Sequence, residues 1–214
     1  FSDDVHGTLA PDGAPTVATI GVPGQVGIFS FTATAGERVY VDISGSTLPA
    51  GCGTFSLHSP ENSTLDLGCT SDAGAGQIDG DLLKDDGRYT VVVDPPDGAL
   101  GQVNLHLITS RDIQGAVTVG GSPVKSSVGI PGQVAFYSFS GTKGQKIKVT
   151  VTGTSLAPQC GIPLLVQPDG GTFDLGCLMS GSMTDTLNVT GTWKVKIDPP
   201  TTQTGTVTFV VEPG

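Results

Sequence analysis

The chain has 214 residues and a formal net charge of −10, with 32 glycines and 15 prolines but only 14% charged and 6% aromatic residues. Glycine and proline at this level interrupt long helices, and the acidic balance excludes nucleic acid as a partner, because phosphate binding needs clustered Lys and Arg. The sequence has no apolar run approaching the roughly 18 residues of a membrane helix, so we expect no membrane insertion.

The chain repeats itself from its first strands onward. Val22–Val26 returns as Ile130–Val134 at a shift of 108, and the shift becomes 104 after the second cysteine of each copy. Solenoid repeats are much shorter, so two copies of this length indicate duplicated domains. We predict domains at residues 1–112 and 113–214, with almost no linker between them.

Both copies alternate apolar and polar residues with a period of two. The segments 38–43, 146–151 and 193–197 are clear examples, rich in Val, Lys and aromatic residues. This period is typical of half-buried strands, and the Gly, Pro, Asn and Asp between them mark turns. The sequence therefore predicts an all-β fold of two tandem antiparallel β-sandwich domains, resembling jelly rolls. The alternation puts Trp193 in a core and Tyr40 on an outward face.

The four cysteines form two equivalent pairs. Cys52 and Cys69 are 17 residues apart, and so are Cys160 and Cys177. Identical spacing predicts one disulfide in each domain, worth about 3 kcal/mol for a loop of this size. A zinc site would show more closely paired ligands. Disulfides indicate an oxidising compartment, so we expect an extracellular or cell-surface protein.

The densest group of carboxylates lies in the first copy, at Asp72, Asp79, Asp81, Asp85 and Asp86. One interpretation is a solvated acidic loop. A second is a calcium site, since carboxylate oxygens are calcium ligands, and a third is a carboxylate pair that acts as acid and base in glycoside cleavage. The second copy keeps only one of these carboxylates, Asp185, which aligns with Asp81. The spacing of the five residues fits no EF-hand. No other cofactor is expected.

The sequence contains no recognisable catalytic constellation. The three histidines, His6, His58 and His106, all lie in the first copy, and no nucleophile-elbow, phosphate-loop or zinc-protease motif is present. We therefore predict that the chain is not an enzyme.

Two surface features are candidate binding sites. Lys146, Lys148, Lys194 and Lys196 occupy the polar faces of their strands, and would form one lysine-rich face if those strands share a sheet. Such a face either solubilises the domain and protects strand edges or binds a partner. Tyr40 is the best candidate for an exposed aromatic that could stack on a sugar ring, and Tyr137 is the second.

Charge is distributed unequally between the copies. Residues 1–112 carry 15 acidic and 4 basic residues, a net charge of −11, whereas residues 113–214 carry 5 acidic and 6 basic residues, a net charge of +1. The asymmetry reflects either two solvated surfaces or head-to-tail attraction between copies of the chain.

Short landmarks suggest a family. The segment Gly24–Val39 and the later segment Gly87–Val93, with their counterparts 132–147 and 191–195, resemble the bacterial pre-peptidase C-terminal (PPC) domain family. The resemblance implies a non-catalytic β-sandwich module of secreted enzymes or surface proteins, related to collagen-binding modules that use calcium. The cysteine pair departs from the pattern and is more similar to repeats of large bacterial surface proteins. No binding residue carries over.

These observations favour a structural or adhesive repeat of an extracellular protein, whose partners are other copies or neighbouring domains of the same protein. The alternative is an accessory module of a secreted hydrolase that binds extracellular polysaccharide or protein.

Overall fold

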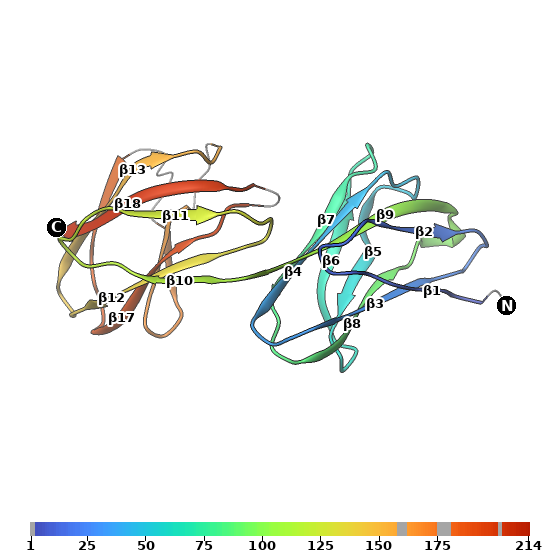
Figure 1. Ribbon diagram of the computed structural model, residues 1–214, viewed down its shortest axis with the longest axis horizontal. Coiled ribbons are helices and arrows are strands. Elements are labelled where there is room, and N and C mark those ends of the chain that lie inside the picture. The colour runs from blue at the N-terminus through green and yellow to red at the C-terminus, as the bar shows by residue number, and fades with distance from the viewer. Residues whose placement is uncertain (1–2, 158–161, 175–180, 201–202) are drawn as a thin grey trace. The chain divides into compact units, whose positions relative to one another are not determined.

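The regular elements of the described residues are all β-strands, apart from one short 3-10 turn at Pro96–Gly98 (Figure 1). The computed structural model describes residues 3–157, 162–174, 181–200 and 203–214. The predicted all-β class is confirmed. By its internal contacts the chain divides into two compact units, residues 1–111 and 112–214.

The first unit contains nine strands in a single sheet, ordered β1-β3-β8-β5-β6-β7-β4-β9-β2. Their bounds are β1 Val5–Thr8, β2 Thr16–Ile20, β3 Gly27–Ala33, β4 Glu37–Ser44, β5 Gly51–His58, β6 Thr64–Thr70, β7 Gly76–Leu82, β8 Gly87–Val93 and β9 Gly101–Arg111. The sheet turns over between β6 and β7, which pair only at Cys69–Gln77 and Thr70–Gly76.

The second unit repeats this order in two sheets, β10-β12-β17-β14-β15 and β11-β18-β13-β16. Their bounds are β10 Ile113–Ala116, β11 Val124–Val128, β12 Ala135–Gly141, β13 Lys146–Thr154, β14 Leu164–Val166, β15 Thr172–Asp174, β16 Gly181–Thr186, β17 Gly191–Ile197 and β18 Gly205–Pro213. Each unit is thus a sandwich of a five-stranded and a four-stranded layer.

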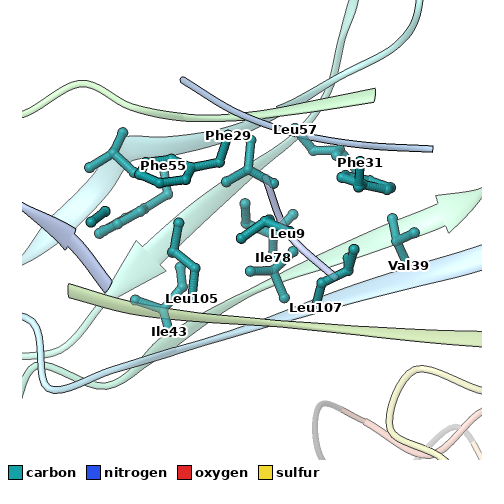
Figure 2. Close-up of a cluster of buried hydrophobic side chains, with 14 of the residues drawn as sticks. Leu9, Phe29, Phe31, Val39, Ile43, Phe55, Leu57, Ile78, Leu105 and Leu107 are labelled. Atoms are coloured by element: carbon teal, nitrogen blue, oxygen red, sulfur yellow. The ribbon is translucent and has the colours of Figure 1, made fainter. Parts of the chain in front are cut away.

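The two layers enclose an apolar core in each unit. In the first unit, Figure 2 shows one layer contributing Phe29, Phe31, Phe55 and Leu57 and the other contributing Val39, Ile43, Leu105 and Leu107. The second core is built likewise around Trp193, Phe209 and Leu165, all completely buried. Every second residue of each central strand points inward, which is the alternation predicted from the sequence.

The first strand of each unit departs from the antiparallel pattern. β1 pairs in parallel with β3, and β10 pairs in parallel with β12, because the intervening strand crosses to the other layer. Both strands carry a glycine over an aromatic ring. A Cβ at Gly7 would lie 2.7 Å from the Phe29 ring, and one at Gly115 would lie 2.6 Å from the Tyr137 ring. A larger residue would displace the ring or the strand.

Candidate functional site

β10 ends before the neighbouring strand β12 does. β10 pairs with β12 only from Ala135 to Ser138, whereas β12 continues to Gly141. The last backbone hydrogen bond at this edge runs from the Val117 N–H to the Ser138 carbonyl, at 2.9 Å. Backbone groups of alternate strand residues point to the same side, so those of Ser140 also face this edge. Within the described residues, β12 therefore lacks a neighbouring strand at Ser140.

A groove of about 600 Å³ lies at this open edge. One wall is the segment Ala116–Val119, where the chain diverges from the sheet, and the other is formed by residues 138–140. All the described lining residues are uncharged, and five carry hydroxyl or amide groups: Thr118, Ser138, Ser140, Gln145 and Thr192. Hydroxyl and amide groups both donate and accept hydrogen bonds, so the groove suits a polar, uncharged chain such as a peptide backbone.

Two of the predicted lysines lie on the same layer as the groove. Lys194 is directly opposite Ser138 on β17, and its ammonium nitrogen lies 5.4 Å from the centre of the Phe136 ring. Lys196 is opposite Phe136 and pairs with the Asp198 carboxylate at 2.7 Å. The Lys194 ammonium thus lies over an aromatic ring and Lys196 is in an ion pair, and neither is among the described residues that line the groove.

The other two lysines lie on the opposite layer, so the predicted single lysine face is wrong. Lys146 and Lys148 belong to β13, which pairs with β16 and β18, whereas the strand of Lys194 pairs with β12 and β14. Lys148 also lies 4.0 Å from the Glu212 carboxylate. Alternation shows which side of a strand is polar, but only the pairing shows to which layer the strand belongs.

In the first unit, Arg88 occupies the position equivalent to Thr192. The exposed Arg88 side chain donates a hydrogen bond from Nη2 to Ser30 Oγ at 2.7 Å, and Ser30 is the counterpart of the groove residue Ser138. The strand edge has the same geometry, because the Leu9 N–H donates to the Ser30 carbonyl at 2.9 Å. A guanidinium therefore lies at Ser30, the counterpart of a residue that lines the groove of the second unit.

The first unit has a cleft of about 340 Å³ elsewhere, between the β5–β6 turn and the β7–β8 loop. Leu65 and Leu82 line it and are 42% and 41% exposed. Tyr89 also lines it, and its hydroxyl donates to the Asp85 carbonyl at 2.8 Å. The cleft therefore combines exposed leucines and a fixed tyrosine with polar and charged residues such as Glu61 and Lys84.

At the same place the second unit carries two stacked rings. Trp193 replaces Tyr89 and donates from Nε1 to the Val189 carbonyl at 3.1 Å. Phe173 replaces Leu65, and its ring centre lies 6.2 Å from that of Trp193 with the planes 22° apart. Each unit therefore has the larger side chain at one of two positions. The first unit has Arg88 where the second has Thr192, and the second has Phe173 where the first has Leu65.

The five candidate calcium ligands lie on β7 and in the turns on either side of it: Asp72, Asp79, Asp81, Asp85 and Asp86. The Asp86 carboxylate accepts a hydrogen bond from the Ala35 N–H at 2.8 Å, which anchors one turn to another. The side chain of Asp81 lies outside the described residues. Among the described residues, no three His, Cys, Asp or Glu side chains gather as metal ligands. Calcium binding stays a prediction from the sequence.

The expectation of an exposed tyrosine platform is wrong. Tyr40 is 1% exposed, and its hydroxyl donates to Gln77 Oε1 at 3.1 Å. Burial raises the pKa of Tyr40 to about 12, and the nearby Asp42 and Asp79 carboxylates act in the same direction. Tyr137 is buried too, with its ring edge against Phe209. A residue on the outward face of a strand can be covered, so alternation alone did not establish exposure.

The first predicted disulfide is confirmed. Cys52 and Cys69 are bonded and lie directly opposite each other on β5 and β6. This bond indicates an oxidising compartment, extracellular or periplasmic. The second predicted pair, Cys160 and Cys177, lies outside the described residues. None of the described helices could cross a bilayer.

One serine–histidine pair is close enough for proton transfer. Ser56 Oγ and His58 Nε2 lie 2.8 Å apart on β5. A catalytic base is normally oriented through its second ring nitrogen. His58 Nδ1 is buried and has no hydrogen-bond partner within the described structure, so no orienting acid completes a triad here.

Sequence reasoning did not find the groove. Its walls are ordinary Ser, Thr and Val residues, and its existence depends on how far β10 accompanies β12. The alignment of the two copies nevertheless contained one indication of the groove. Arg88 aligns with Thr192, and the residues on either side are similar in the two copies. A long charged side chain replaced by a short hydroxyl marks a place where the two surfaces differ.

Comparisons with known proteins leave the family open. No family model matches the chain, and no curated protein matches it. Among solved structures, it is similar to PliG of Aeromonas hydrophila, a periplasmic inhibitor of g-type lysozyme, with 17% identity and a TM-score of 0.38 over 51% of this chain and all of that one. It is also similar to the CUB1-EGF-CUB2 region of human MASP-1/3, with 5% identity and a TM-score of 0.28 over 93% of this chain and all of that one.

Proposed function

We propose that the chain is a non-catalytic, adhesive repeat module of an extracellular protein that binds protein partners. The observation that supports this best is the groove of the second unit, which combines an open strand edge with hydroxyl-bearing walls. Exposed strand edges pair readily with other chains, and proteins usually protect them. The two copies differ beside this edge, because the first has Arg88 bonded to Ser30 where the second has the short Thr192, and an open edge is suited to binding.

The disulfide and the disposition of the ionisable residues support the same proposal. The Cys52–Cys69 bond suits a protein exposed to an oxidising exterior. The close Ser56–His58 pair has no orienting acid among the described residues, so the structure offers this pair little catalytic power. The resemblance to the PPC family favours a bacterial surface protein or a module beside a secreted enzyme.

A retention assay tests this proposal. The whole chain is immobilised and exposed in parallel to collagen, to a soluble sample of the same chain, and to insoluble cellulose and chitin. We expect retention of at least one protein and of neither polysaccharide, and we expect light scattering to show whether the chain associates with itself. Retention of polysaccharide alone would favour the accessory module of a secreted hydrolase. Retention of nothing, with a strictly monomeric chain, would overturn the adhesive role.

A further inference from the structure

We propose that the groove of the second unit binds an extended peptide, which adds to the edge of β12 where β10 ends. This inference rests on the proposed function and names the partner of the same site. Addition of a strand to an open edge is a recurrent mode of peptide recognition, in which backbone hydrogen bonds supply affinity and alternate side chains supply specificity.

The backbone geometry defines where the peptide would lie. β10 already runs parallel to β12, and its last hydrogen bond ends on the Ser138 carbonyl. The next groups on this edge are the N–H and carbonyl of Ser140, which is exposed. A peptide that continues the line of β10 would form hydrogen bonds with both groups, while Val117–Val119 forms the outer wall of the groove.

Alternation defines the side chains that the peptide should carry. Residues beside Ser140 would point outward, on the face that carries the hydroxyl groups of Ser138 and Thr192, so polar residues fit there. Their neighbours would point toward the buried side of Val117 and Phe139, so small apolar residues fit there. The peptide is therefore extended, with polar and β-branched apolar residues in alternation.

A polysaccharide fits this groove less well. Sugar rings stack on exposed aromatic faces, and the aromatic residue nearest the groove on the outward face, Phe136, already has the Lys194 ammonium above its ring. The other aromatic residues nearby are buried: Tyr137 and Phe139 on β12 and Trp193 on β17.

The first unit provides the blocking mutation. Arg88 crosses the equivalent place there, so Thr192→Arg should carry the same obstruction into the second unit. Thr184→Arg is the matched control, because Thr184 is equally exposed but lies on β16 in the other layer.

The test uses the whole chain and a synthetic octapeptide of alternating Val and Glu, with binding followed by NMR titration. We expect the peptide to shift the Ser140 amide resonance and to slow its hydrogen exchange. Thr192→Arg should weaken binding by about tenfold or more, and Thr184→Arg should leave it unchanged. The same octapeptide with alternate backbone nitrogens methylated should also lose about tenfold, because it cannot donate the ladder hydrogen bonds.

Three results would overturn strand addition. The first is no peptide binding, and the second is equal binding of the methylated and unmethylated peptides. The third is that Thr192→Arg loses binding to a polyuronate but keeps binding to the peptide. That result would make the groove a glycan site. If the chain binds no peptide but associates with itself, and Thr192→Arg abolishes that association, the occupant of the groove is a second copy of the chain. In each case, protein retention by the immobilised chain would still decide the adhesive role separately.

Discussion

The two units share a strand order but leave space at different places on their surfaces. The first unit has Arg88 bonded to Ser30 on β3 and a cleft between its β5–β6 turn and β7–β8 loop. The second unit has an open groove at the first of these places and the Phe173–Trp193 stack at the second. Both copies keep the residues that the sandwich requires, whereas the differences Arg88/Thr192 and Leu65/Phe173 give the two copies different surfaces. Five predictions probe the two units, from the largest expected effect to the smallest.

Removing the ring that closes the second unit should have the largest effect. Trp193 is completely buried and stacks on Phe173, so Trp193→Ala should lower the free energy of unfolding of that unit by about 3–5 kcal/mol. Chemical denaturation followed by circular dichroism measures this loss. Lys146→Ala, an exposed change in the same unit, is the control and should stay within about 0.5 kcal/mol. A loss of under about 1 kcal/mol for Trp193→Ala would show that the ring does not support the core.

Opening the disulfide of the first unit should have the next largest effect. Cys52 and Cys69 are separated by 17 residues, and a loop of that length contributes about 3 kcal/mol by restricting the unfolded chain. The double variant Cys52→Ser, Cys69→Ser should lose about that much stability in urea denaturation. Reductant should destabilise the unaltered first unit similarly and leave the variant's first unit unchanged. Equal stability of the variant and the oxidised chain would contradict the prediction.

The sequence was sufficient for the features that depend on local alternation. The segment 38–43 is a strand with Val39, Val41 and Ile43 buried, and Trp193 is in a core, because a period of two follows directly from strand geometry. The Cys52–Cys69 bond was likewise predictable, since two copies of one domain keep the same cysteine spacing when each closes its own bridge.

Features that depend on pairing between distant segments were not predictable. Lys148 and Lys194 have the same local pattern, yet they lie on opposite layers, because β13 and β17 have different partners. The groove depends on β10 being shorter than β12, which no local pattern indicates. The predicted exposure of Tyr40 is wrong for a related reason, since contacts with other parts of the fold cover this outward-facing side chain.

The burial of Tyr40 predicts an alkaline dependence of stability in the first unit. Its pKa is raised from 10.0 to about 12, so the unfolded chain loses the phenolic proton first as the pH rises. The contribution of Tyr40 to the free energy of unfolding is therefore fully present below pH 10. It is lost as the pH rises through about 12. Tyr40→Phe should lose less stability than the unaltered chain over this interval, as measured by denaturation at each pH. Parallel pH profiles for the two chains would contradict the assignment.

At neutral pH the same variant measures how much the Tyr40 hydroxyl contributes to the free energy of unfolding. Tyr40→Phe removes the hydrogen bond to Gln77 Oε1 while keeping the ring, so it should cost about 1 kcal/mol. A cost near zero would mean that water replaces the tyrosine hydroxyl at Gln77 without loss.

The smallest effect on stability, and the most informative for the comparison, is expected for Arg88→Thr. The exposed arginine makes one hydrogen bond, to Ser30, so its loss should cost less than about 1 kcal/mol in denaturation. The variant should nevertheless open a groove along β3 and allow the Val–Glu octapeptide to shift amides of the first unit as well as the second. The double variant Arg88→Thr, Thr192→Arg should move those shifts from the second unit to the first. If Arg88→Thr opens no new site, the arginine is not the obstruction, and the difference between the units must come from the segments that follow β1 and β10.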